Sequence, residues 1–376
     1  MINHVKKIIN NSKNKMISYS QFINTVLYSP EIGYYMKHQE KVGTKGDFIT
    51  SSNLSNVYGK LFANLFIQLI ESGQIPPVIC EIGGGNGRFA KAVLEEIENV
   101  SPNLLKDLTY IMIEKSPFHQ HLQQYVVSKK VNVRQFDDIF QFYEYSQSYQ
   151  GILFSNELFD AFPVEVIEKK GKSMYEVKIT INADDELEER LVPLTNKDIL
   201  MYLQEQEIEL DEGQRFEVPL AMKGYVKSLG ELIDKGVIFT VDYGYSNDEW
   251  MEPVHRHGSL RGYYQHQMIN NPLLHPGDMD LTTHIHFDAL INYGEEAGLH
   301  FVKKMRQDHF LLSAGILKYL QNHYDPNPFS EVSKQNRGIR TLISSEGMSS
   351  AFHVIIQQKN MEVNWETIFQ AYFDKI

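Results

Sequence analysis

The chain reads Glu81-Ile-Gly-Gly-Gly-Asn-Gly87 after an apolar run, Pro77 to Cys80, and before a helix-like segment, Arg88 to Ile97. A strand, a glycine-rich turn and a helix in this order form the first half of a nucleotide-handling α/β unit. Glycine lets the backbone approach a ligand where any Cβ would collide, and the free N–H groups at the start of the helix face that ligand. We therefore expect a small, partly anionic ligand above this turn.

Composition narrows the class of protein. The 376 residues are enough for one large domain or two, and the net charge of -12 argues against nucleic acid as the main partner. The single cysteine, Cys80, lies inside the apolar strand and fits a reducing compartment. No stretch approaches the roughly 20 apolar residues that span a bilayer, and the N-terminus lacks the apolar region of a secretion signal. We expect a cytoplasmic protein without membrane insertion.

Further apolar runs, separated by helical patterns, predict a parallel sheet that is covered on both faces. These runs are Leu108 to Glu114, Val131 to Phe136, Gln150 to Ser155 and Gly236 to Val241. Ligands of open α/β sheets bind outside the carboxyl ends of the strands, where every run here ends in polar residues. These candidates for one cleft are Glu81, Glu114, Asp137, Asp138, Asn156, Glu157 and Asp242. The alternative for each acid is a cap on the following helix.

Segments outside the sheet predict a second, substrate-facing lobe. Residues 1–73 form an N-terminal extension that ends in an amphipathic helix over Leu54 to Ile70, and residues 74–376 form the core. Insertions interrupt the core at about 164–225 and 245–280. The first predicts a hairpin of Val164 to Glu168 with Met174 to Ile181, followed by a charged turn over Asn182 to Arg190. The second carries several histidines.

Two cofactor classes fit a glycine turn with an acid after the next strand, because both carry a ribose whose hydroxyls need a carboxylate acceptor. Dinucleotide sites use G-x-G-x-x-G with the acid about 20 residues further on. Here Arg88 and Phe89 follow Gly87 without the third small residue, and Glu114 comes later than that rule. Glu81 would also repel a pyrophosphate but attract an ammonium or sulfonium group. These differences favour S-adenosylmethionine over a dinucleotide as the cofactor.

Six motifs in order resemble those of the MidA family of class I S-adenosylmethionine-dependent methyltransferases. They are Tyr28 to Tyr35 (YSPEIGYY), Gly46 to Thr50 (GDFIT), Glu81 to Gly87 (EIGGGNG), Asn156 to Pro163 (NELFDAFP), Gly258 to Tyr263 (GSLRGY) and Asp280 to Asp288 (DLTTHIHFD). The resemblance covers nearly the whole chain. It implies an α/β fold with a seven-stranded, mostly parallel sheet, closed by an antiparallel pair near His300 to Arg306 and Ala351 to Gln358.

The resemblance also implies roles for individual residues. Those expected at the cofactor are Gly83, Gly85 and Gly87 beside its methionine end, Glu81 near the ammonium, Glu114 at the ribose, Asp137 or Asp138 at the adenine, and Asn156 at the methyl group, with Gly46 and Thr50 in a covering loop. Those expected at the reacting groups are Glu157, Asp160 and, from the covering loop, Asp47.

The resemblance makes a protein arginine the expected methyl acceptor. Its guanidinium is cationic with a pKa above about 12, so carboxylates must hold it, concentrate its charge on the far nitrogens and receive a proton. Glu157 and Asp160 are the best such pair, although Asp160 has the alternative of bracing the turn into Pro163. His284 and His286 could share one strand face, but the spacing supplies no clear third ligand, so we expect no metal.

Two other functions remain open at this point. One is a non-catalytic assembly factor that keeps the fold as an S-adenosylmethionine-binding module, and the other is a small-molecule methyltransferase, for which the insertions are larger than needed. The expected partner is a protein substrate. The sequence leaves the oligomeric state open, a homodimer included.

Overall fold

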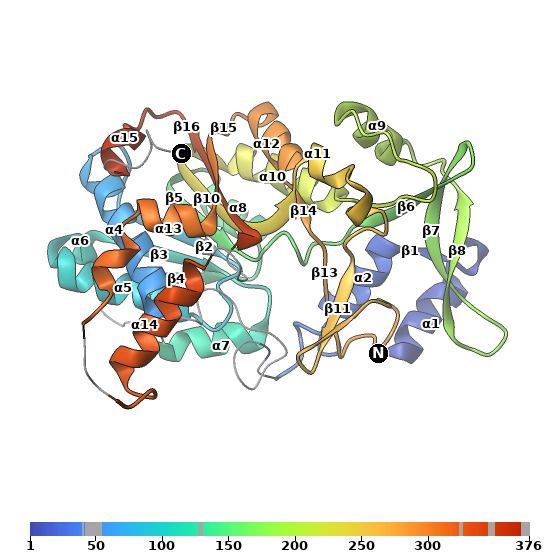
Figure 1. Ribbon diagram of the computed structural model, residues 1–376, viewed down its shortest axis with the longest axis horizontal. Coiled ribbons are helices and arrows are strands. Elements are labelled where there is room, and N and C mark those ends of the chain that lie inside the picture. Colours follow the sequence, from blue (N-terminus) through green and yellow to red (C-terminus); the bar gives the residue numbers. More distant parts are fainter. Residues whose placement is uncertain (40, 42–54, 127–130, 323–325, 345–349, 370–376) are drawn as a thin grey trace.

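The computed structural model describes residues 1–39, 41, 55–126, 131–322, 326–344 and 350–369. Its largest sheet has the strand order β15-β16-β10-β5-β2-β3-β4 (Figure 1). The strands are β2 (Val78–Ile82), β3 (Thr109–Ile113), β4 (Asn132–Phe136), β5 (Tyr149–Asn156), β10 (Ile233–Tyr245), β15 (His300–Arg306) and β16 (Phe352–Lys359). Neighbours from β10 to β4 pair in parallel, whereas β16 is antiparallel to both β10 and β15. The expected seven-stranded, mostly parallel sheet is confirmed.

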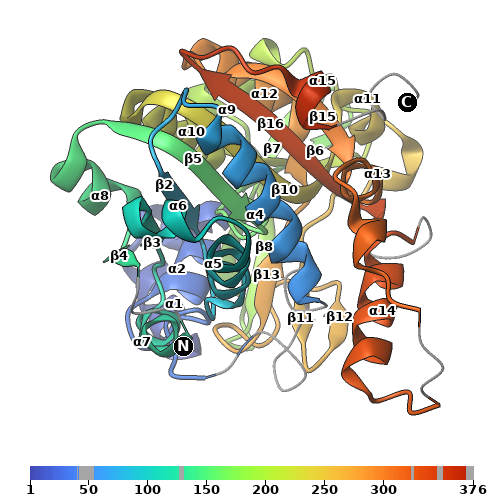
Figure 2. The same cartoon turned by 90° about the vertical axis from the view of Figure 1, so that its left-hand side faces the viewer.

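Helices cover both faces of this sheet because its strands are apolar on both sides. On β5, Ile152 and Phe154 belong to the core under α4 (Asn56–Glu71) and α5 (Arg88–Val100). Leu153 points to the opposite core, which contains α10 (Leu220–Leu232) and α12 (Phe287–Glu296). Figure 2 shows α4 lying across the first face.

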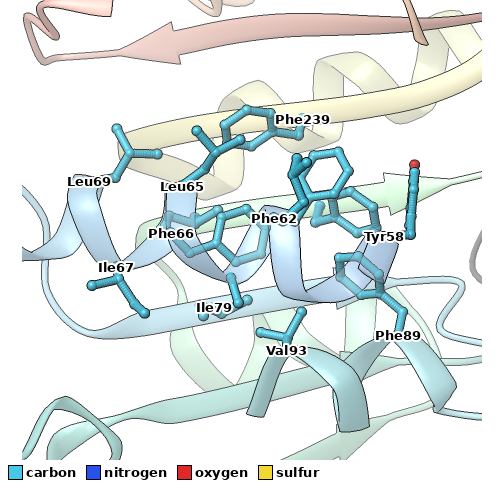
Figure 3. Close-up of a cluster of buried hydrophobic side chains, with 14 of the residues drawn as sticks. Tyr58, Phe62, Leu65, Phe66, Ile67, Leu69, Ile79, Phe89, Val93 and Phe239 are labelled. Carbon is cyan, nitrogen blue, oxygen red and sulfur yellow. The ribbon is translucent and has the colours of Figure 1, made fainter. Parts of the chain in front are cut away.

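Aromatic rings fill the core under α4, as Figure 3 shows. Phe154 stacks on Phe89 of α5 with ring centroids 4.0 Å apart, and Phe62 of α4 lies 4.8 Å from Phe154. The two helices cross closely at Gly59, where an added Cβ would lie 2.7 Å from the Cβ of Ala92. This packing fixes α5, and therefore the turn that precedes it, against the sheet.

The N-terminal extension and the first insertion share a second sheet, seen at the right of Figure 1. Its order is β1-β7-β6-β9, with β8 beside β7. The strands are β1 (Ile17–Ser18), β6 (Glu165–Lys170), β7 (Ser173–Ile181), β8 (Leu187–Pro193) and β9 (Arg215–Val218), and the lobe also holds α1 (Ile2–Asn11), α2 (Tyr19–Tyr28) and α9 (Lys197–Glu205). The predicted hairpin is confirmed. The predicted charged turn over Asn182 to Arg190 is too long, because strand β8 already begins at Leu187.

A small sheet of β11 (Arg261–Tyr264), β12 (Gln267–Ile269) and β13 (Asp280–Thr282) comes from the second insertion. In Figure 1, β11 and β13 lie between the two larger sheets. The remaining elements are β14 (Ile285–His286), α6 (Pro102–Asp107), α7 (Pro117–Val126), α8 (Ile139–Ser146), α11 (Asn247–Trp250), α13 (Gln307–Ser313), α14 (Glu331–Leu342), α15 (Trp365–Ile368), η1 (Lys13–Lys15), η2 (Pro253–His255) and η3 (Ile316–Tyr319). Among the described helices, none has the length and apolar character to cross a membrane.

Candidate active site

The glycine turn after β2 needs its glycines for backbone conformation. Gly83, Gly85 and Gly87 have φ angles of 73°, 51° and 78°, a left-handed region that costs other residues free energy. An ideal Cβ at Gly85 would meet no described atom within 4 Å, so the backbone there is open to a ligand. At Gly87, which is the N-cap of α5, an added Cβ would lie 3.2 Å from Gln123.

A cavity of about 1090 Å³ opens at the carboxyl ends of the strands. The predicted residues that line it are Glu81, Gly83, Gly85, Glu114, Asp137, Asp138, Asn156, Glu157 and Asp160. Gly87 is not part of the lining. Gly46, Asp47 and Thr50 lie outside the described residues.

Glu114 follows β3, and backbone N–H groups hold its carboxylate. Its Oε2 accepts from Gly85 N at 2.9 Å and its Oε1 accepts from Ser116 N at 2.8 Å. Burial raises the pKa of Glu114 to about 7, against the lowering effect of these two amides. The acid is thus fixed next to the open glycine backbone, where a ribose hydroxyl could donate to its remaining lone pairs.

Glu81, near the end of β2, also lines the cavity. Its side chain is buried and its Oε2 accepts from the Tyr110 hydroxyl at 2.8 Å. Burial raises the pKa of Glu81 to about 8, only partly offset by that hydrogen bond. A cationic ammonium group near Glu81 would lower this pKa again, because an opposite charge favours the carboxylate.

Asp137 and Asp138, after β4, have different surroundings. Asp138 is the N-cap of α8 and accepts from Gln141 N at 2.8 Å, so the capping alternative is confirmed for it. Asp137 accepts from Gln120 Nε2 at 2.8 Å and stays exposed at the rim. Both still line the cavity.

Asn156 and Glu157 form one hydrogen-bonded unit after β5. The Tyr58 hydroxyl donates to Asn156 Oδ1 at 2.9 Å, and Asn156 Nδ2 donates to Glu157 Oε1 at 2.9 Å. Glu157 has a φ of 52°, a left-handed conformation that is uncommon outside glycine. The strained backbone and the held carboxylate mark this turn as a functional candidate.

Asp160 is buried in the same turn and lines the cavity. The Tyr243 hydroxyl donates to its Oδ2, whereas its buried Oδ1 has no hydrogen-bond partner of good geometry among the described residues. Burial raises the pKa of Asp160 to about 6, against the lowering effect of Tyr243 and of neighbouring backbone amides.

Asp242 does not reach the cleft, so its prediction as a lining residue was wrong. Its carboxylate accepts from Phe159 N at 3.0 Å and from Tyr243 N at 2.9 Å, and it does not line the cavity. Asp242 therefore braces the turn that carries Asp160. The sequence had suggested a bracing role for Asp160 itself, as the alternative to catalysis. Desolvation raises the pKa of Asp242 well above its usual range.

The far wall of the cavity uses residues to which the sequence motifs assigned no role. Tyr28 and Tyr35 stack with centroids 5.5 Å apart, and their hydroxyls donate to Ala161 O at 3.0 Å and Asp280 Oδ1 at 2.8 Å. Lys115 Nζ lies 4.5 Å from the Tyr28 ring centroid. In the sequence, the only indication of this wall was that Tyr28 and Tyr35 belong to the motif Tyr28 to Tyr35.

The histidines in the described part of the chain do not gather into a metal site. In the described ranges no group of three or more His, Cys, Asp or Glu side chains could hold a metal ion. His284 and His286 do not share a strand face as suggested, since β14 contains only His286 of the two. His286 is buried against Tyr202 and Asn247, whereas His284 lines the cavity and bonds Arg261.

These residues fit S-adenosylmethionine. The open backbone at Gly85 leaves space for the methionine end, and Glu114 offers an acceptor for ribose hydroxyls. Glu81 can supply a negative charge below the turn once a cationic group lowers its pKa. When bound, this cofactor supplies a methyl group on a sulfonium, which is reactive toward a nucleophile. The strand order, the glycine turn and the cavity define a class I S-adenosylmethionine-dependent methyltransferase.

Comparison with known proteins agrees with this class. A family model described as "Putative S-adenosyl-L-methionine-dependent methyltransferase" matches residues 61–305, and the chain belongs to that family. The expected membership of the MidA family is thereby confirmed.

Relatives and solved structures extend the similarity to most of the chain. The mouse mitochondrial protein arginine methyltransferase NDUFAF7 is 26% identical over 372 residues, which cover 90% of this chain and 80% of that protein. Its human counterpart is 24% identical over 369 residues, with 90% and 79% covered. A COG1565 superfamily member from Burkholderia thailandensis, bound to S-adenosyl-homocysteine, has a TM-score of 0.85 at 23% identity and covers 96% of this chain and 94% of its own.

Proposed function

We propose that this methyltransferase acts on an arginine side chain of a protein. The observation that carries the proposal is the Asp160 carboxylate, which lines the cavity. A guanidinium has five N–H donors in a planar fork that matches the oxygens of a carboxylate. Glu157 and Asp280 add two further carboxylates to the same cavity.

The chemistry assigns separate tasks to these carboxylates. A guanidinium held by charged hydrogen bonds on one edge presents its opposite nitrogen to the methyl group, and positioning supplies much of the rate. Asp160, whose pKa is about 6, can also accept the proton that the methylated nitrogen loses. The stacked rings of Tyr28 and Tyr35 supply an aromatic wall beside the cation.

The relatives support this acceptor, since NDUFAF7 of mouse and human is named a protein arginine methyltransferase. The cavity is consistent with this acceptor, because about 1090 Å³ lies at the upper end of the roughly 300–1,000 Å³ of cofactor and small-ligand pockets and leaves room for a side chain beside a cofactor.

The test is to incubate the full chain with tritium-labelled S-adenosylmethionine and cell-extract protein, and then to hydrolyse the product and separate its amino acids. We expect label in methylarginine. Asp160→Asn should lower transfer by at least about 30-fold, because losing one member of a buried charged pair costs about 2–5 kcal/mol. Calorimetry should show unchanged affinity for S-adenosyl-homocysteine.

Asp184→Asn is the matched control, since Asp184 is exposed in the turn between β7 and β8. Label in another amino acid, or wild-type transfer by the Asp160 variant, would overturn the proposal. If the wild type labels no protein and Glu157→Gln fully rescues a deletion phenotype, the chain serves as a non-catalytic assembly factor. Label confined to small molecules would identify a small-molecule methyltransferase.

A further inference from the structure

Arg261 places a cation among the carboxylates of the cavity, which Lys115 also lines. It lies at the start of β11, in the second insertion, and lines the same cavity as Glu157, Asp160 and Asp280. Its guanidinium donates to Ser259 O at 3.1 Å and to His284 Nδ1 at 2.7 Å, with a long contact to the sulfur of Met268. None of the carboxylates in the described part of the chain forms an ion pair with it.

The partners of Arg261 orient it without neutralising it. Burial and the neighbouring Arg261 charge lower the pKa of His284 to about 3, so the imidazole is neutral and accepts the hydrogen bond. His284 is itself held by the Tyr245 ring, with which it stacks at 4.4 Å and an interplanar angle of 4°. The guanidinium is therefore pre-positioned, and its charge remains available to a ligand.

We propose that Arg261 binds a carboxylate of a molecule that occupies the cavity. Arginine matches this group because its planar N–H fork pairs with two carboxylate oxygens. Its place along the sheet favours the acceptor protein over the cofactor as the source. Tyr245 ends β10, and β5 separates β10 from β2 and its glycine turn, a distance of about 10 Å at the usual strand spacing. For that source the inference rests on the proposed function, and an acidic residue beside the target arginine would supply the carboxylate.

The first arm of the test measures the acceptor by binding, so it does not depend on turnover. Fluorescein-labelled arginine peptides with Glu at each flanking position, and their Gln counterparts, are titrated onto protein saturated with S-adenosyl-homocysteine. Wild type should prefer a Glu peptide by about tenfold or more, as a charge-assisted hydrogen bond implies. Arg261→Gln should abolish the preference and Arg261→Lys should keep part of it.

The second arm measures the cofactor by calorimetry with S-adenosyl-homocysteine and with 5′-methylthioadenosine, which lacks the carboxylate. A loss of about tenfold in affinity for the first ligand alone in Arg261→Gln would assign the carboxylate to the cofactor. Arg256→Gln, in the same insertion but outside the cavity lining, is the control. The inference fails if Arg261→Gln changes neither the preference for Glu peptides nor the affinity for S-adenosyl-homocysteine. It also fails if the wild type shows no preference for Glu peptides and Arg261→Gln binds both cofactor ligands as the wild type does.

These outcomes separate the inference from the proposed function. The melting temperature of each variant is measured as well. If Arg261 serves folding alone, Arg261→Gln should lower the melting temperature without changing the preference for Glu peptides or the relative affinity for the two cofactor ligands. If Arg261 effects appear while no methylarginine is found, the carboxylate site stands and the arginine proposal falls. If methylarginine is found without any Arg261 effect, the reverse holds.

Discussion

Replacing Glu81 by glutamine should remove a pH dependence from the stability of the ligand-free protein. Glu81 is buried beneath the glycine turn, and burial raises its pKa from 4.5 to about 8. The folded state therefore holds this proton more tightly than the unfolded chain. Stability from this group is fully present below pH 4.5 and is lost as the pH rises toward 8.

The size of the effect follows from the shift. One pKa unit corresponds to about 1.4 kcal/mol, so between about pH 5.5 and pH 7.5 the wild type should lose about 3 kcal/mol through Glu81. Glu81→Gln cannot ionise and keeps an oxygen for the Tyr110 hydroxyl. Its free energy of unfolding should thus approach or overtake that of the wild type as the pH rises.

The assay is urea unfolding of both proteins at several pH values, followed by circular dichroism without cofactor. Because other buried carboxyls are shared, only the difference between the two proteins is interpreted. Glu95→Gln, at an exposed position on α5, controls for the loss of one negative charge. A difference between wild type and Glu81→Gln that stays constant within about 0.5 kcal/mol across this range would refute the buried, protonated carboxyl.

Three further outcomes follow from the same structure. Glu114→Gln should weaken S-adenosyl-homocysteine binding about tenfold in calorimetry, because an amide is a poorer acceptor than a carboxylate; an unchanged affinity would exclude Glu114 from the cofactor site. Tyr243→Phe removes the hydroxyl that lowers the pKa of Asp160, so the acidic limb of the methyl-transfer pH profile should move to higher pH; a superimposable profile would contradict this. Phe154→Ala should cost about 3–5 kcal/mol in urea unfolding, since its ring stacks on Phe89 in the core, and a loss below about 1 kcal/mol would show that the core repacks.

The central strands β2, β3, β5 and β10 were predictable because they are continuous apolar runs that are buried on both faces. β8 was not, since this edge strand carries Glu188, Glu189 and Arg190 on partly or fully exposed positions and therefore resembles a charged turn. The pairing of β1 with β7 joins segments far apart in the chain, and no local pattern signals it.

At the site, position in a motif predicted which residues gather but not which way they face. Glu114 and Asp160 line the cavity as expected, whereas Asp242 is turned into backbone amides at the same sheet edge. Strand ends are readable from hydropathy, but the direction of a carboxylate depends on tertiary hydrogen bonds. A role for Arg261 could not be predicted for a related reason. Arg261 lines the cavity without an ion pair to a carboxylate of the described residues, and this depends on three-dimensional packing.

The strand β1 has a consequence for biosynthesis. Ile17 and Ser18 leave the ribosome early, yet their partners Ile179 and Lys178 emerge only after four strands of the larger sheet have been made. Tyr28 can contact Ala161 somewhat earlier than β1 can pair, whereas Tyr35 must wait until Asp280 has been made. The nascent chain therefore passes through a stage in which the strands that precede Glu81 and Glu114 have been made, while the wall formed by Tyr28 and Tyr35 still lacks Asp280.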